Sequence, residues 1–223
     1  MLQNTTYIQI LIGVLLLIIG AIFAGIGTLI RDCYRLRQEK LSTAYAFKGE
    51  INALLSIIEK RKYINLLEEK IKNQEDSLYK LSEYKVNESK KQHNPTPYEI
   101  KMKFLELNNG IKPLMSFTFS INKDVFFVKN ALKNKMGLLE KVSENVVAFY
   151  DYANAFLLDN EDNQKSNEVY KKLINKNSPP NFLEILRQSI ERHKEMLEIA
   201  KIIIKTGKES IEGLDTFISK QLS

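Results

Sequence analysis

The residue types that carry most enzymatic chemistry are scarce in this chain of 223 residues, which has one cysteine and two histidines. Nucleophilic catalysis requires a hydroxyl or thiol beside a base, and histidine is the commonest base. His93 precedes two prolines in a polar stretch, so we expect a solvated loop residue. His193 falls on an apolar helix face, where we expect a structural side chain; the functional alternative is a contact that responds to pH. The sequence therefore predicts no catalytic residue.

Metal and phosphate sites are not indicated by residue spacing either. One cysteine and two histidines that are far apart in the sequence make no zinc pattern. The acidic run at residues 159–163 resembles a calcium loop, but Gln164 and Tyr170 occupy the positions that require Gly and Glu. We therefore expect an exposed turn between helices there. Glycine motifs that bind phosphate do not occur in the sequence, so we expect neither a cofactor nor a metal.

The excess of positive charge does not point to nucleic acid. The net charge is +6, from 33 basic and 27 acidic side chains. The basic residues are spread along the chain, and arginine, which matters more for nucleic-acid recognition, is less common than lysine. Lys129 and Lys133 share a predicted helix face that could touch anionic lipid or nucleic acid, but we prefer a solvated lysine face. No nucleic-acid partner is favoured.

The element that positions everything else is the opening stretch, which has no charged side chain before Arg31. Residues 7–30 are almost entirely apolar and would extend about 36 Å as a helix, enough to cross a hydrocarbon core of about 30 Å. This length predicts a transmembrane helix over 7–30, with 1–6 as a short segment outside the cell. A cleaved signal peptide fits less well, because residues 1–6 have no basic side chain and no A-x-A site follows.

Charges beside the predicted span set its expected orientation. Four basic side chains form a predicted juxtamembrane anchor: Arg31, Arg35, Arg37 and Lys40. Because basic residues favour the cytoplasmic side, we expect residues 31–223 in the cytoplasm and a location in the inner (plasma) membrane. Cys33 could be acylated beside the bilayer, but we prefer an inert reduced thiol.

Small residues recur inside the predicted span and could let two helices approach closely. The positions concerned are Gly13, Gly20, Ala24 and Gly27. Glycine is common in membrane helices in general, so dimerisation and background composition explain these residues equally well. A homo-oligomer is therefore one expected partner arrangement, beside the bilayer itself.

Helical periodicity dominates the remaining chain. We expect a juxtamembrane stalk and first helices over 31–84, helical throughout as far as Asn73 and weakest at Gly49. A polar loop is expected at 85–97 and a helical bundle at 98–223. Within that region we expect a weak helix at 98–107, an extended arm at 116–121, and helices at 123–137 and 139–156.

The most regular pattern lies between Leu183 and Ile218, where apolar residues alternate in steps of three and four. Ser178, Pro179 and Pro180 supply a helix start, and Asn181 offers an alternative cap. The seam residues that we single out are Leu186, Ile190, His193, Leu197, Ala200, Ile204, Gly207 and Ile211. Additional apolar residues widen this face, which favours a packed bundle over an isolated coiled-coil dimer. The predicted fold is therefore all-α, with one N-terminal transmembrane helix and a cytoplasmic bundle of long heptad-patterned helices.

Two helical stretches, Gly49–Ile71 and Met136–Tyr150, resemble an uncharacterised group of single-pass bacterial membrane proteins with helical cytoplasmic regions. The resemblance implies a bacterial inner-membrane location. It carries over no catalytic or binding residue.

Three functions remain open. We expect a membrane-tethered helical interaction or scaffold protein that binds an unidentified protein or a second copy at the cytoplasmic face. The alternative is a signal-coupling component, in which association of the spans passes down a continuous juxtamembrane helix. The third is an enzyme whose acid–base groups meet only in the fold, and it requires a pocket of convergent side chains.

Overall fold

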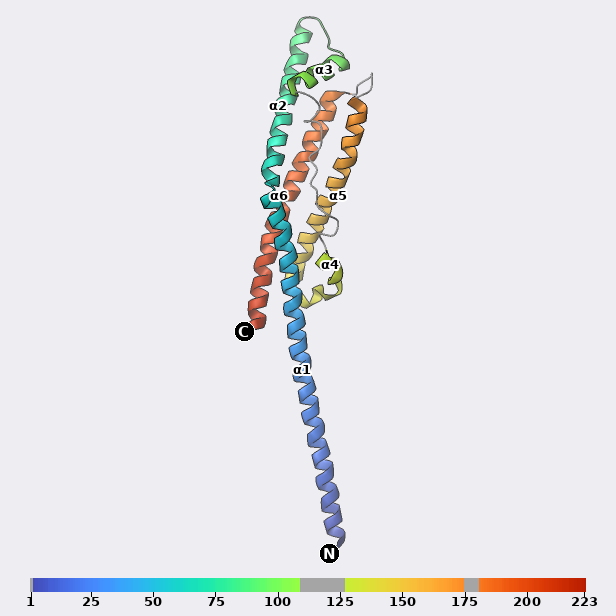
Figure 1. Cartoon of the computed structure of the whole chain (residues 1–223), viewed down its shortest axis with the longest axis vertical. Coiled ribbons are helices and arrows are strands. Elements are labelled where there is room, and N and C mark those ends of the chain that lie inside the picture. Colours follow the sequence, from blue (N-terminus) through green and yellow to red (C-terminus); the bar gives the residue numbers. More distant parts are fainter. Residues whose placement is uncertain (1, 109–126, 175–180) are drawn as a thin grey trace.

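The computed structural model describes residues 2–108, 127–174 and 181–223, and all regular secondary structure among them is helical (Figure 1). In chain order these helices are α1 (Leu2–Lys60), α2 (Tyr63–Lys90), α3 (Pro97–Asn108), α4 (Phe127–Ala131), the 3-10 helix η3 (Lys133–Leu139), α5 (Val142–Ile174) and α6 (Phe182–Leu222). The predicted all-α fold class is confirmed, and the first helix is long and apolar as predicted.

Helix α1 has two parts with different surroundings. Its first part projects alone from the rest of the chain, while its second part lies among the other helices (Figure 1). The predicted weak point at Gly49 is wrong, because α1 passes this residue without a break. A single helical glycine costs only about 1 kcal/mol relative to alanine. The fully buried neighbours Phe47 and Ile51 hold the helix in place on either side.

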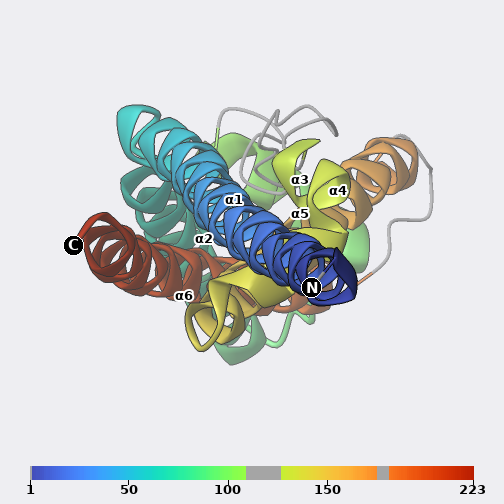
Figure 2. The same ribbon diagram turned by 90° about the horizontal axis from the view of Figure 1, so that it is seen from below.

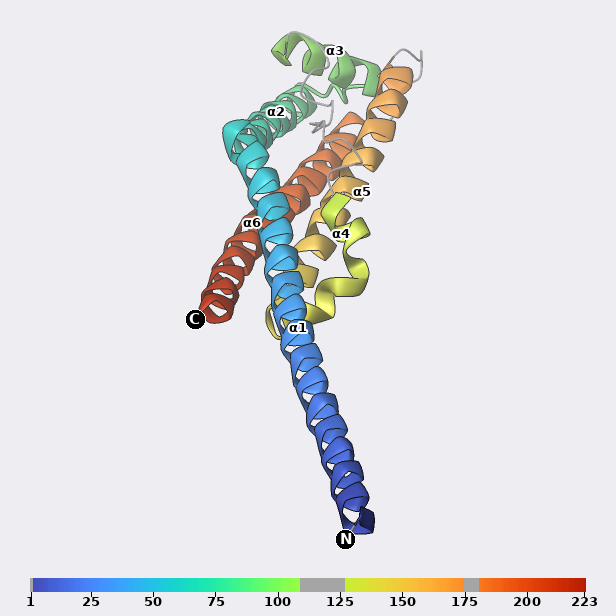
Figure 3. The ribbon, with the colours of Figure 1, turned by 60° about the horizontal axis from the view of Figure 1, so that its bottom comes forward.

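The break falls at Lys62 instead, so the prediction of one helix through Asn73 is corrected to two helices. Lys62 has the left-handed backbone conformation, with φ 50° and ψ 38°, and the chain changes direction between α1 and α2 (Figure 3). Ile58 and Tyr63 are both buried, but a step of five residues does not fit a helical period of 3.6. The left-handed residue interrupts the helix, so that Tyr63 can face the core as Ile58 does. The buried face of α2 therefore continues the buried face of α1.

Helix α6 is the element against which the other long helices pack. It contacts α5, α1 and α2 along its length (Figures 1 and 2). Contacts between buried aromatic rings mark three levels of the core, with centroids 5.9 Å apart for Phe47 and Tyr150, 5.2 Å for Tyr63 and Phe156, and 5.6 Å for Phe104 and Phe182. Such rings bury more apolar area than any other side chains. The core therefore extends from the second part of α1 to α3.

The predicted polar loop at 85–97 is shorter than expected. Helix α2 continues to Lys90, and only residues 91–96 separate it from α3. The polar residues of this stretch are adequate helix formers, and Lys91 pairs with Glu88 at 2.8 Å at the helix end. His93 lies in the connection and is half exposed, as predicted for a loop residue. The helix expected at 98–107 is confirmed as α3.

The turn expected at the acidic run 159–163 is wrong, because α5 continues through it to Ile174. Exposed or half-buried helix faces and turns are both polar; here Asp162 is exposed and Asp159 and Glu161 are half-buried. Asp162 pairs with Lys165 one turn later at 3.1 Å, which supports the helix.

The helix expected at 123–137 is described only in part, as the separate short helices α4 and η3, and Gly137 lies inside η3. Asn181 stands at the N-cap of α6, but its side chain makes no capping hydrogen bond within the described chain. The extended arm at 116–121 and the helix start at Ser178, Pro179 and Pro180 lie outside the described residues.

Candidate functional site

The projecting part of α1 is apolar and uncovered. Side chains from Val14 to Ile30 are exposed, and Leu17 and Phe23 keep 75% and 70% of their surface accessible. Among the described helices, α1 alone is long and apolar enough to cross a membrane, and none of its apolar window is buried. A contiguous apolar surface of this kind on a soluble monomer is rare and marks an interaction with lipid or protein.

The small residues predicted to pack membrane helices lie on this projecting part. A Cβ atom added at Gly13, Gly20 or Gly27 would meet nothing within 4 Å, and Ala24 is exposed. Its carbonyl accepts a hydrogen bond from the Thr28 hydroxyl at 2.9 Å. A second helix could therefore approach these positions, and their role in self-association stays a prediction.

A basic groove lies where α1 leaves the packed helices. Its volume is about 370 Å³, and it is lined by Cys33, Leu36, Arg37, Lys40, Lys220, Gln221 and Ser223. Helix α1 supplies the first four of these residues and the end of α6 supplies the others. The Arg37 Nε donates a hydrogen bond to the Gln221 carbonyl, which fastens the two helices together. We call this site the juxtamembrane groove, after its place beside the predicted membrane span.

Two of the four predicted anchor residues, Arg37 and Lys40, belong to the juxtamembrane groove. Arg31 and Arg35 lie before it on the exposed part of α1 and do not line it. Lys220 is a groove residue that sequence reasoning missed. No local pattern could have found it, because nothing in the sequence brings the end of α6 beside residue 37.

Acidic side chains around the groove already have basic partners. Lys40 pairs with Glu140 at 2.8 Å, and this hydrogen bond and the lysine charge hold the pKa of Glu140 below its usual range. Glu39 likewise has its pKa lowered by a hydrogen bond and ion pair with Lys135 at 2.7 Å.

Two cations of the groove are not neutralised in this way. Arg37 and Lys220 form no direct ion pair with any residue that the structure describes. The charge of Lys220 contributes to lowering the pKa of Glu140, which Lys40 already pairs with. No acidic side chain is present among the groove's lining residues in the described part of the chain. The groove therefore carries a positive excess.

The predicted seam of α6 faces the interior. Of its eight singled-out residues, Ile204 and Ile211 are half-buried and the others are buried. Gly207 marks a point of close approach, where an added Cβ would lie 2.9 Å from a methyl carbon of Leu55. The seam is thus occupied by helices of the same chain and is not a free surface.

His193 is a core residue with hydrogen-bond partners. Its Nδ1 lies 2.8 Å from Gln74 Oε1, and Gln74 Nε2 donates to Ser189 Oγ at 2.8 Å. Burial, with the positive charges of Lys70 and Arg192, lowers the pKa of His193 to about 4. The imidazole is therefore neutral at physiological pH, which fits the expected structural role. Sequence reasoning missed Gln74 because its partner lies on a distant helix.

A second, partly buried polar cluster joins α1 to α4. The Glu50 carboxylate accepts hydrogen bonds from the backbone N–H groups of Val128 at 2.7 Å and Lys129 at 3.2 Å, and from the Tyr150 hydroxyl. Burial and the neighbouring carboxylate raise the pKa of Tyr150. The arrangement satisfies donors at the start of a helix and so has a structural explanation.

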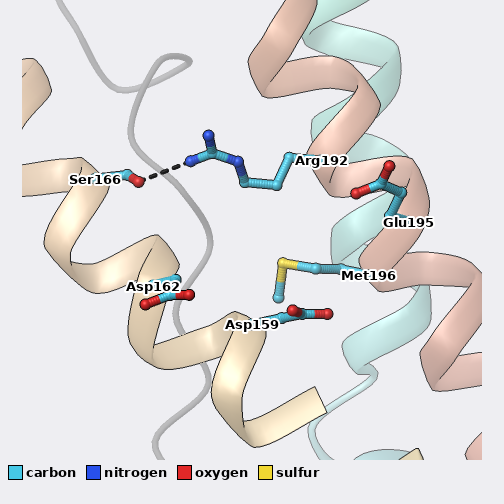
Figure 4. Close-up of a pocket in the computed structure, with 6 residues that line it drawn as sticks. All are labelled: Asp159, Asp162, Ser166, Arg192, Glu195 and Met196. Carbon is cyan, nitrogen blue, oxygen red and sulfur yellow. Dashed lines mark hydrogen bonds between the residues drawn. The ribbon is translucent and has the colours of Figure 1, made fainter. Parts of the chain in front are cut away.

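An acidic cleft of about 260 Å³ lies between α5 and α6 (Figure 4). It is lined by Asp159, Asp162, Ser166, Arg192, Glu195 and Met196. Arg192 Nη1 donates to Ser166 Oγ at 2.7 Å across the cleft (Figure 4). Burial raises the pKa of Asp159, and the charges of Glu195 and Asp162 add to the effect. Within the described residues no group of three potential ligands could hold a metal ion.

The cleft only partly meets the requirement of the enzyme alternative. It brings carboxylates from two helices together, but its described lining contains no histidine, lysine or tyrosine. The juxtamembrane groove is therefore the better candidate site, because it combines unneutralised charge with an adjoining exposed apolar helix.

The chain matches no protein-family model, no curated protein and no solved structure. The resemblance of Gly49–Ile71 and Met136–Tyr150 to single-pass bacterial membrane proteins therefore stays a prediction.

Proposed function

We propose that this protein is a membrane-tethered helical scaffold. In this proposal the apolar part of α1 crosses the inner membrane, and the following helices form a heptad-patterned bundle at the cytoplasmic face. That bundle binds another protein or a second copy of the chain. Tethering raises the local concentration of such a module, so a weak contact is sufficient.

One observation carries the proposal: α1 is a single helix that is exposed and apolar at its start and buried in the core later on. Leu41, Phe47 and Ile51 are core residues, whereas the side chains between Val14 and Ile30 are exposed. The bilayer is the simplest cover for an apolar helix of this length. Because the tether and the core share one helix, the body stays close to the membrane surface.

The single, exposed Cys33 provides a native probe for location and orientation. We expect the full-length chain to remain in the membrane fraction after carbonate extraction. A membrane-impermeant maleimide should leave Cys33 unlabelled in intact cells and label it after permeabilisation, and Cys33→Ser should abolish the signal. Labelling in intact cells would reverse the proposed orientation. Recovery in the soluble fraction would reject the tether.

The same cysteine tests self-association. If copies of α1 associate, a bismaleimide crosslinker should convert the detergent-extracted protein into dimers through Cys33. The yield should fall when Gly20 and Ala24 are both replaced by leucine, because bulky side chains separate the helices. A monomer in both proteins would remove the second copy as a partner, and a different protein would then be required.

The signal-coupling alternative has one specific observation in its favour. It requires an unbroken helix across Arg31–Leu41, and α1 is unbroken there. From Ile30 to the bend at Lys62 the helix covers about 48 Å, so a rotation of the span would reach the core. Cysteines placed one at a time at positions 31–41 should crosslink with helical periodicity. A flat profile would reject this alternative.

A further inference from the structure

We propose that the juxtamembrane groove holds the phosphate of an anionic phospholipid headgroup, while an acyl chain of that lipid lies along the exposed apolar face of α1. The inference rests on the proposed membrane location. It adds a specific ligand, and it adds Lys220, a residue from the far end of the sequence.

Helical spacing places the groove and an apolar stripe on one face of α1. Residues three or four apart share a helix face. The series Ile19, Ile22, Ile26, Leu29, Cys33, Leu36, Arg37 and Lys40 follows this spacing, and its apolar members Ile19, Ile22, Ile26, Leu29 and Leu36 are exposed. The face therefore changes from apolar to cationic in the order of a phospholipid, which has an acyl chain followed by a phosphate.

The depth of the cations suits a headgroup. Arg37 lies about 10 Å beyond Ile30 along the helix axis, at about 1.5 Å per residue. The headgroup layer is roughly 5–7 Å thick on each side of the hydrocarbon core. Arginine and lysine side chains extend several ångströms toward such a layer from outside it. The cationic side chains of the groove can thus reach the lipid phosphates from just outside the headgroup layer.

Charge favours an anion over a zwitterion. Arg37 and Lys220 form no direct ion pair among the described residues; the charge of Lys220 acts on Glu140, the carboxylate that Lys40 already pairs with. Lys40 has only an exposed partner, since the side chain of Glu140 keeps 59% of its surface accessible, and such pairs are weak and exchange readily. These three cations have one neighbouring carboxylate, that of Glu140, so the groove keeps a positive excess. The ammonium group of a zwitterionic lipid would find no acidic side chain on the groove lining.

The end of α6 does not repel an anion as a bare helix C-terminus would. Carbonyl groups at a C-terminus carry partial negative charge. Here the Gln221 carbonyl accepts from Arg37, and the Lys220 carbonyl accepts from the Ser223 hydroxyl at 3.0 Å. The Ser219 carbonyl accepts from the Ser223 backbone N–H at 3.1 Å. With these acceptors occupied, the cationic side chains dominate the groove.

A lipid held by Arg37 and Lys220 connects α1 to α6 as the Arg37–Gln221 hydrogen bond does. Binding therefore stabilises the folded chain, and the stabilisation grows with the logarithm of the lipid concentration above the dissociation constant. The test uses the delipidated full-length chain in detergent and thermal unfolding followed by circular dichroism. The probes are dioctanoyl phosphatidylglycerol, dioctanoyl phosphatidylcholine and glycerol phosphate.

Two double variants with equal charge loss separate the groove from general electrostatics. One is Arg37→Gln with Lys220→Gln; the other is Lys205→Gln with Lys208→Gln, on an exposed face of α6 away from the groove. At about 1 kcal/mol per cation, losing both groove charges should weaken phosphatidylglycerol binding about 30-fold. The control pair should weaken phosphatidylglycerol binding less than about 3-fold, because salt screens charges that lie far from the site. Lys220→Gln alone keeps the Arg37–Gln221 bond and should still weaken binding, so misfolding cannot mimic the result.

Several outcomes overturn the inference. Equal binding of the two lipids would exclude recognition of an anionic headgroup. Equal weakening in both double variants would exclude the groove. Binding of glycerol phosphate as tight as that of the lipid would make the site a soluble-anion site. Each of these results leaves carbonate extraction and Cys33 labelling unchanged, so the lipid site and the membrane tether can fail separately.

Discussion

Replacing Gly207 by alanine tests the closest approach between helices in the core. A Cβ atom at this position would lie 2.9 Å and 3.0 Å from the two methyl carbons of Leu55 and 3.0 Å from Cε2 of Phe149. The best separation between carbon atoms is about 3.5–4.0 Å. Both neighbours are buried, with 5% and 0% of their surface exposed. They belong to α1 and α5, so α6 cannot relieve the contact by moving away from one without approaching the other.

Two opposing effects determine the magnitude. Alanine is favoured over glycine in a helix by about 1 kcal/mol. Inserting a methyl group into a packed core costs about 1–3 kcal/mol. Gly49→Ala is a matched control, because Gly49 is an exposed glycine inside α1 and an added Cβ meets nothing within 4 Å. Gly49→Ala should therefore stabilise the protein by about 1 kcal/mol, and Gly207→Ala should destabilise it by up to about 2 kcal/mol. The difference between the two variants isolates the cost of overpacking.

The measurement is urea unfolding of the full-length chain in detergent, followed by circular dichroism because the chain has no tryptophan. Detergent should keep the apolar part of α1 helical in both states, so the transition reports on the packed helices. The m-values should agree among the three proteins, which makes the midpoints comparable. If Gly207→Ala stabilises the chain as much as Gly49→Ala does, α6 does not approach Leu55 and Phe149 as described.

Three further changes probe other parts of the core. The folded-state pKa of His193 is about 4, below the unfolded value of about 6.5, so the unfolded state takes up the proton first as the pH falls. Lowering the pH from 7.5 to 5 should therefore cost about 2 kcal/mol of unfolding free energy. His193→Leu should lose this pH dependence in the same urea assay. Glu50→Gln should destabilise the chain by about 1–3 kcal/mol, because an amide cannot accept from both α4 backbone N–H groups and the Tyr150 hydroxyl as the carboxylate does. Faster hydrogen exchange at the α4 amides would confirm this loss. As a control, Glu209→Gln on an exposed face should change stability by less than about 0.5 kcal/mol. Lys62→Gly should stabilise the chain by about 1 kcal/mol, because glycine adopts the left-handed conformation without steric cost. The control Lys60→Gly, inside α1, should destabilise the chain. A loss of stability in Lys62→Gly would contradict the backbone conformation assigned to Lys62.

Local periodicity was enough to predict helices, but not to predict how they meet. The regular spacing from Leu183 to Ile218 predicted α6 and its buried face, because each step of that pattern lies within one helix. The bend at Lys62 has no clear sequence signal, because the step of five from Ile58 to Tyr63 is recognised only once both side chains are known to be buried. At 159–163 polarity predicts a turn, although the polar face of a helix has the same composition. Periodicity carries no information about the partner of a face.

The candidate site shows the same limit more clearly. Arg37 and Lys40 could be singled out from their positions beside the apolar stretch, since charges near a span follow a general rule. Lys220 could not, because it reaches the groove only through the packing of α6 against α1. The buried pair of Gln74 and His193 is comparable: each residue is unremarkable in its own helix, and only the contact between α2 and α6 unites them.

Exposed polar contacts join α1 to the end of α6 beside the groove. The Arg37 bond to Gln221 and the ion pair of Lys48 with Asp215 both join α1 to the last turns of α6. These contacts are exposed and individually weak. The core contacts earlier in α6, around His193 and Gly207, are buried. The last turns of α6 therefore combine exposed polar contacts to α1 with the buried core residues Leu214, Phe217 and Ile218. Under the lipid-site proposal, a bound anionic lipid changes the charge beside the exposed contacts, while the buried residues keep α6 packed against the other helices.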